Sequence, residues 1–74
     1  MDSKITQIFK SLNAKITQLA PEMRLKEDLN LDSVLLIQLA IEINNQYGID
    51  LGEKADQGKT IKTVGDILKC LNEP

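Results

Sequence analysis

Residues 33–47 read SVLLIQLAIEINNQY and form the most apolar stretch of the chain. In an α-helix, with about 100° per residue, one apolar arc is formed by Leu36, Ala40, Ile43 and Tyr47. Ile37 and Leu39 lie beside this arc. The opposite, polar side carries Gln38, Glu42 and Asn45. Gly48 follows as a left-handed C-terminal cap, with Ile49 placed for the apolar contact that accompanies such a cap. The stretch predicts an amphipathic helix.

Three large apolar residues do not fit that helix as core residues. Val34, Leu35 and Ile41 lie at or within its polar side. Core packing does not explain them, although single apolar residues are common on protein surfaces.

The preceding half of the chain predicts one helix and a long loop. Apolar residues recur at helical spacing over residues 3–19, Asp2 or Ser3 can cap the start, and Pro21 marks the stop. Residues 20–32 have no clean period, and their leucines are expected to attach a long loop to the core. Loops of this length within a small domain are uncommon and often functional.

The C-terminal third predicts a short helical turn within residues 52–60 and a last helix over residues 63–71. Thr63 and Asp66 match a capping box at its start. Strand-like alternation is absent. We therefore expect an all-α fold, a small four-helix bundle of three main helices and one short helix, with a long loop between the first two main helices. The expected core is Ile5, Ile8, Phe9, Leu12, Leu36, Ala40, Ile43, Tyr47, Ile61, Val64 and Leu68.

Length and charge narrow the classes of function. The 74 residues suit one domain, residues 1–74, and a net charge of −2 argues against nucleic acid as a partner. Residues 22–56 carry eight acids against three bases, so the middle of the chain is its acidic part. No run is apolar and long enough for a membrane span, residues 1–7 lack the apolar segment of a signal peptide, and the lone Cys70 suits a reducing compartment. We expect a monomer in the cytoplasm, with Cys70 packed against the bundle.

The composition is poor for catalysis. The chain has no histidine, which removes the commonest general base and the commonest zinc ligand. It has no nucleophile elbow, phosphate-binding loop or CxxC pair, and its acids do not have metal-ligand spacing. We expect neither an enzyme nor a metal site.

The ordered motifs along the chain resemble the acyl carrier protein family. Residues 25–34 read LKEDLNLDSV, the next helix ends in YGIDL (47–51), and residues 60–68 read TIKTVGDIL. Together with the length and the long first loop, these motifs extend the resemblance over nearly the whole chain.

The resemblance implies that Ser33 is the attachment point of 4′-phosphopantetheine. A phosphopantetheinyl transferase would transfer this group from coenzyme A, with magnesium needed by the transferase only, and the arm would hold acyl groups as thioesters. Asp32 is the supporting residue, as a helix cap and near the magnesium of the modification complex. A phosphodiester at a helix start gains about 0.3–1 kcal/mol from the helix dipole. The carrier would be non-catalytic, with acyl-loading, synthase and transferase enzymes as partners.

The resemblance also implies a partner surface at Val34 and Ile41, and we expect Leu35 and Glu42 of the same helix to belong to it. Carriers of fatty acid biosynthesis typically have acids two and five residues after the serine, where this chain has Leu35 and Gln38. This departure favours a specialised carrier, for example in polyketide, nonribosomal-peptide or unusual-lipid biosynthesis, over the housekeeping carrier. Two alternatives remain: an aminoacyl (D-alanyl or peptidyl) carrier, and a helical interaction module that works without the arm.

Overall fold

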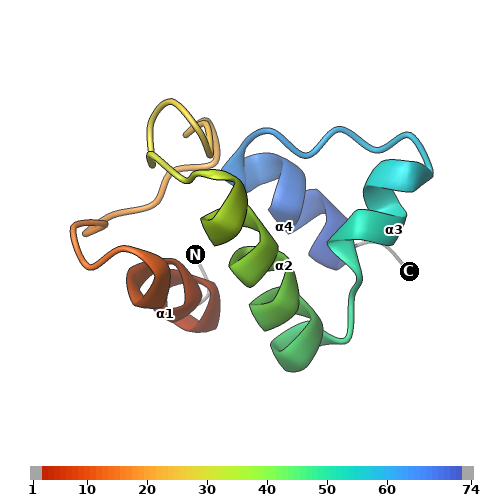
Figure 1. Ribbon diagram of the computed structural model, residues 1–74, viewed down its shortest axis with the longest axis horizontal. Coiled ribbons are helices and arrows are strands. Elements are labelled where there is room, and N and C mark those ends of the chain that lie inside the picture. Colours follow the sequence, from red (N-terminus) through yellow and green to blue (C-terminus); the bar gives the residue numbers. More distant parts are fainter. Residues whose placement is uncertain (1–2, 73–74) are drawn as a thin grey trace.

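Four helices form the regular secondary structure of the described residues. The computed structural model describes residues 3–72, with α1 (Ser3–Leu12), α2 (Ser33–Tyr47), α3 (Leu51–Asp56) and α4 (Val64–Asn72) (Figure 1). The predicted all-α class is confirmed, as are the short third helix and the long connection between α1 and α2.

Helix α1 is shorter than predicted, because it ends at Leu12 and not at Leu19. Asn13 ends it by offering acceptors to the residues that follow. The N–H of Lys15 donates to Asn13 Oδ1 at 3.0 Å, and the N–H of Ile16 donates to the Asn13 carbonyl at 3.0 Å. Asparagine side chains compete in this way with helical hydrogen bonding. Ile16 is nevertheless buried, as part of the loop and not of the helix.

The long loop, residues 13–32, is fastened to the start of α4. Figure 1 shows its yellow part beside the blue segment that leads into α4. Three backbone hydrogen bonds join them: Leu25 N–H to the Lys62 carbonyl (2.9 Å), Val64 N–H to the Met23 carbonyl (2.9 Å) and Gly65 N–H to the Pro21 carbonyl (2.8 Å). A Cβ on Gly65 would lie 2.9 Å from the Pro21 carbonyl oxygen. Glycine therefore permits this close approach of the two segments.

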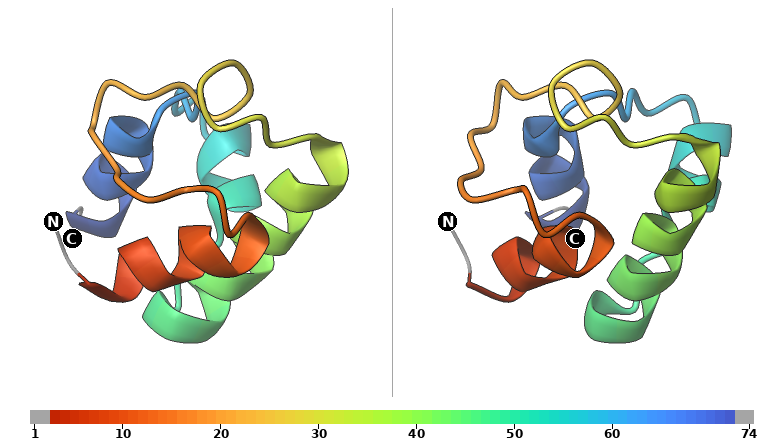
Figure 2. Two further views of the ribbon diagram at one scale, coloured as in Figure 1. Left: turned by 90° about the vertical axis from the view of Figure 1, so that its left-hand side faces the viewer. Right: turned by 60° about the vertical axis from the view of Figure 1, so that its left-hand side comes forward.

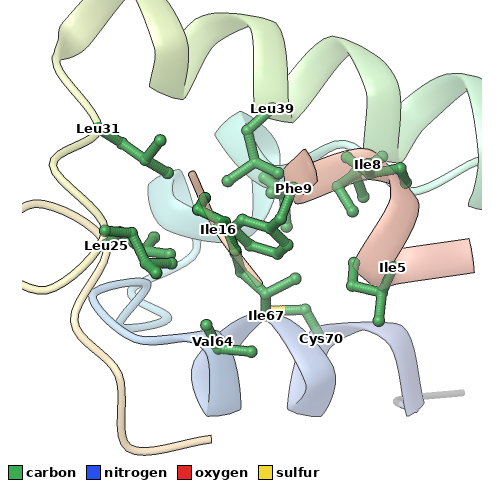
Figure 3. Close-up of a cluster of buried hydrophobic side chains, with 13 residues drawn as sticks. Ile5, Ile8, Phe9, Ile16, Leu25, Leu31, Leu39, Val64, Ile67 and Cys70 are labelled. Carbon is green, nitrogen blue, oxygen red and sulfur yellow. The ribbon is translucent and has the colours of Figure 1, made fainter. Parts of the chain in front are cut away.

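The core combines side chains of the helices with those of the loop. Figure 3 shows Phe9, Leu39 and Ile67 converging from α1, α2 and α4. Loop leucines complete the cluster. The buried hydrophobic residues are Ile5, Ile8, Phe9, Ile16, Leu25, Leu29, Leu31, Leu39, Ile43, Leu51, Val64, Ile67 and Cys70.

The predicted core needs correction, most clearly on α2 and α4. Leu39 of α2 and Ile67 of α4 are buried where Leu36 and Leu68 were expected. The apolar arc of each helix is wide, and packing against the other helices decides which of its residues are buried most deeply. The expected core residues that are only partly buried are Leu12, Leu36, Ala40, Tyr47, Ile61 and Leu68.

The predicted capping box holds the start of α4. Thr63 Oγ1 accepts a hydrogen bond from the Asp66 N–H at 3.1 Å. In return, Asp66 Oδ2 accepts from the N–H groups of Lys62 (2.9 Å) and Thr63 (3.1 Å). These bonds, that of Lys62 first, hold the pKa of Asp66 below its ordinary value of 3.8, against a smaller opposite effect of burial.

The Asp66 carboxylate makes the free energy of unfolding depend on pH. Because its pKa is lower in the folded chain, its stabilising effect is present above the ordinary pKa and lost as the pH falls through the folded-state pKa. We expect Asp66→Asn to lose about 0.3–1 kcal/mol of unfolding free energy at neutral pH. Urea unfolding along a pH series should show this gap closing in acid, where both chains are uncharged at residue 66. A gap of constant size would contradict the assignment.

Candidate functional site

Ser33 is the first residue of α2 and is exposed. The preceding Asp32 is the N-cap, as predicted: its Oδ1 accepts the Leu35 N–H at 2.8 Å, and its carbonyl accepts the Leu36 N–H at 2.9 Å. Helix geometry leaves the N–H groups of Ser33 and Val34 without partners inside the helix. The Ser33 hydroxyl therefore lies at the positive end of α2, a setting that suits a bound phosphate.

The loop holds this helix start in place. Leu31, two residues before Ser33, is 2% exposed, and its N–H donates to the Leu25 carbonyl at 3.0 Å. Asn30 takes up the turn between them with a φ of 55°, a left-handed conformation that asparagine tolerates well. Ser33 thus follows directly on a segment fixed in the core.

Arg24 and Asp28 brace the same loop. The Arg24 guanidinium Nε lies 3.2 Å from Asp28 Oδ2, which also accepts the Arg24 backbone N–H at 2.7 Å. These hydrogen bonds, the side-chain bond first, lower the pKa of the Asp28 carboxyl. Asp28 belongs to the LxxDLxLDSV motif. Besides containing Ser33, this motif therefore stabilises the loop.

The exposed face of α2 carries an apolar stripe. Val34 (61% exposed), Ile37 (62%) and Ile41 (53%) follow one another at helical spacing and are called the α2 stripe below. Val34 and Ile41 are exposed, as their position on the polar side predicts, but Leu35 is half-buried against the core. Ile37 was expected beside the buried arc. Because Leu39 and not Leu36 is at the centre of that arc, Ile37 points away from it.

Glu42 lies apart from Ser33, on the side of α2 that faces α1. It is half-buried and lines two shallow pockets between these helices, one with Lys4 and Ser11 and the other with Ile41. Of the predicted partner residues, Val34 is the neighbour of Ser33 in the chain, and Glu42 is the most distant in sequence.

An open groove of about 680 Å³ lies beside the start of α2. Its lining comes from the long loop, from α2 and from the segment that precedes α4. The lining residues are Arg24, Leu25, Lys26, Glu27, Leu36, Ile61, Lys62 and Thr63. The groove opens between the long loop and residues 61–63, and no local sequence signal points to it.

Among residues 3–72, no group of histidine, cysteine, aspartate or glutamate side chains is arranged to hold a metal ion. Within the same part of the chain, no helix is both long and apolar enough to cross a membrane.

Comparisons with known proteins gave one family match and several curated relatives. The family described as "Phosphopantetheine attachment site" matches residues 3–71. The acyl carrier proteins of Rickettsia massiliae (strain Mtu5) and Rickettsia typhi (strain ATCC VR-144 / Wilmington) are each 33% identical over 69 residues, which cover 93% of this chain and 78% of theirs. That of Rickettsia bellii (strain OSU 85-389) is 29% identical over 59 residues, 80% of this chain and 70% of its own. No solved structure gave a significant match.

Proposed function

The chain belongs to the acyl carrier protein family, whose members are non-catalytic carriers with a covalent 4′-phosphopantetheine, and we propose that Ser33 is its attachment residue. When bound, the group supplies a thiol that forms thioesters with acyl intermediates. The single observation that carries this proposal is the exposed Ser33 hydroxyl at the start of α2, beside N–H groups that the helix leaves unpaired.

Asp32 is proposed as the supporting residue. Its side chain caps α2 through the Leu35 N–H, and its carboxylate is exposed beside Ser33. A carboxylate in this place can also approach a magnesium ion held by the transferase. No metal site of the chain's own is proposed.

The α2 stripe is proposed as the docking surface for the phosphopantetheinyl transferase and for acyl-loading and synthase enzymes, with Leu35 and Glu42 at its borders. Every such enzyme has to approach Ser33, and the stripe begins at the next residue. Glu42 is the only charged side chain of α2. Docking on this helix therefore depends on apolar contact more than on charge, which supports a specialised carrier of lipid or polyketide-type biosynthesis.

Mass spectrometry of the intact protein tests the attachment. After incubation with coenzyme A, magnesium and a promiscuous phosphopantetheinyl transferase, the wild-type chain should gain the mass of one phosphopantetheine. Ser33→Ala should gain none, because it lacks the acceptor hydroxyl. Ser11→Ala, which removes a serine from exposed α1 surface, is the matched control and should be modified like the wild type.

A wild-type chain that is folded by circular dichroism but remains unmodified would contradict the proposal. It would favour the alternative of an interaction module that works without an arm. Modification of Ser33→Ala would instead place the arm on another residue.

A further inference from the structure

The groove beside the start of α2 lies within reach of a group attached to Ser33. Leu36, which lines it, is three residues beyond Ser33 and therefore on the same face of α2, with Cβ atoms about 5–6 Å apart in a helix. Leu25 and Ile61 complete its apolar lining. An acyl chain on a flexible arm can thus lie against these three side chains without leaving the neighbourhood of its attachment point.

The remaining lining of the groove is mostly basic. Arg24, Lys26 and Lys62 contribute cations, and Glu27 contributes one acid. Arg24 is already neutralised, since its Nε lies 3.2 Å from Asp28 Oδ2 and 3.5 Å from Glu27 Oε2.

The two lysines of the groove are not neutralised. Neither Lys26 nor Lys62 forms an ion pair within the described part of the chain. Asp66 lies close to Lys62 in sequence, but its carboxylate accepts the backbone N–H groups of Lys62 and Thr63. Two ammonium groups are therefore available at the groove, on an acidic protein of net charge −2.

We infer that this groove favours an acyl group that ends in a carboxylate, which extends the proposed attachment at Ser33 to a class of cargo. The methylene part of such a group would contact Leu25, Leu36 and Ile61, and its carboxylate would pair with Lys26 or Lys62. An aminoacyl group carries an ammonium, which the same lysines repel. The charge of the groove thus favours an acidic acyl cargo over the aminoacyl alternative.

Three arms of matched length separate these possibilities by NMR. The chain is modified with coenzyme A analogues that carry amide-linked butyryl, succinyl or β-alanyl groups, which resist hydrolysis. Because an exposed ion pair is worth at most a few-fold in affinity, we expect the succinyl arm to shift the amide signals of Leu25, Leu36 and Ile61 about three-fold more than the butyryl arm. The β-alanyl arm should shift them least, and high salt should reduce the differences.

Paired lysine variants identify the groups responsible. Lys26→Gln combined with Lys62→Gln should lower the effect of the succinyl arm to that of the butyryl arm. Lys10→Gln combined with Lys15→Gln removes the same charge from exposed positions outside the groove and should leave the preference intact.

The outcomes separate this inference from the attachment on which it rests. A mass gain on Ser33 with equal shifts for all three arms overturns the cargo class and leaves the attachment standing. A preference for succinyl that survives in the Lys26→Gln/Lys62→Gln chain also overturns it. Absence of any mass gain overturns both.

Discussion

Phe9→Ala should lose about 3–5 kcal/mol of unfolding free energy, the range for removing a buried aromatic side chain. Phe9 is 0% exposed and lies where α1, α2 and α4 meet (Figure 3). It is one of two aromatic residues in the chain, the other being Tyr47, so the neighbouring aliphatic side chains cannot easily fill the space. A domain of 74 residues has a total stability of about 4–11 kcal/mol. The loss is therefore a large fraction of the total, and at the low end of that range the variant would be partly unfolded even without denaturant.

Urea unfolding followed by far-ultraviolet circular dichroism measures this loss. Phe9→Leu keeps most of the volume and should lose about 1–2 kcal/mol. Val34→Ala removes an exposed side chain and should change the unfolding free energy by no more than about 0.5 kcal/mol. If Phe9→Ala lost less unfolding free energy than Phe9→Leu, Phe9 would not be at the centre of the core.

Ile37→Asp should reduce kcat/KM of the transferase reaction about ten- to thirty-fold, as expected for a central interface residue. Ile37 is in the middle of the α2 stripe, one helical turn after Ser33, and is 62% exposed. A carboxylate there has to be desolvated against an apolar partner surface, which is costly without a partner charge. Because Ile37 is outside the core, the unfolding free energy should change little.

Asn45→Asp is the matched control for the docking surface. It places the same charge on an exposed residue of the same helix, three turns beyond Ser33. Its kcat/KM should stay within about two-fold of the wild type. A two-fold change corresponds to a binding free energy smaller than that of a central interface contact. Equal losses in the two variants would indicate that added negative charge, and not the α2 stripe, controls the reaction.

Local signals in the sequence predicted the helix ends that depend on a single cap. Gly48 has the expected left-handed φ of 71°, Asp32 caps α2, and Thr63 and Asp66 form the reciprocal cap of α4. Each of these caps depends on residues within a few positions of one another, so a short stretch of sequence is enough to predict it. The same holds for Ser33, whose position at a helix start follows from its neighbours.

Features that depend on distant segments were not predictable in this way. Ile16 keeps the spacing of α1 but packs from the loop, because Asn13 ends the helix first. The apolar residues of α2 fit two buried arcs, and only contact with α1 and α3 selects Leu39 over Leu36. The groove needs the long loop and residues 61–63 side by side, which no short window of sequence encodes.

The fastening of the long loop to α4 also has a consequence for how the chain folds. Figure 2 shows the loop passing over the helices, and its three hydrogen bonds connect residues about forty positions apart. Closing a loop of that size costs conformational entropy before the contacts are gained. This pairing of distant segments should slow folding relative to bundles with short connections only. Amide protons of Leu25, Val64 and Gly65 would then exchange with solvent only when the whole domain opens, reporting global unfolding.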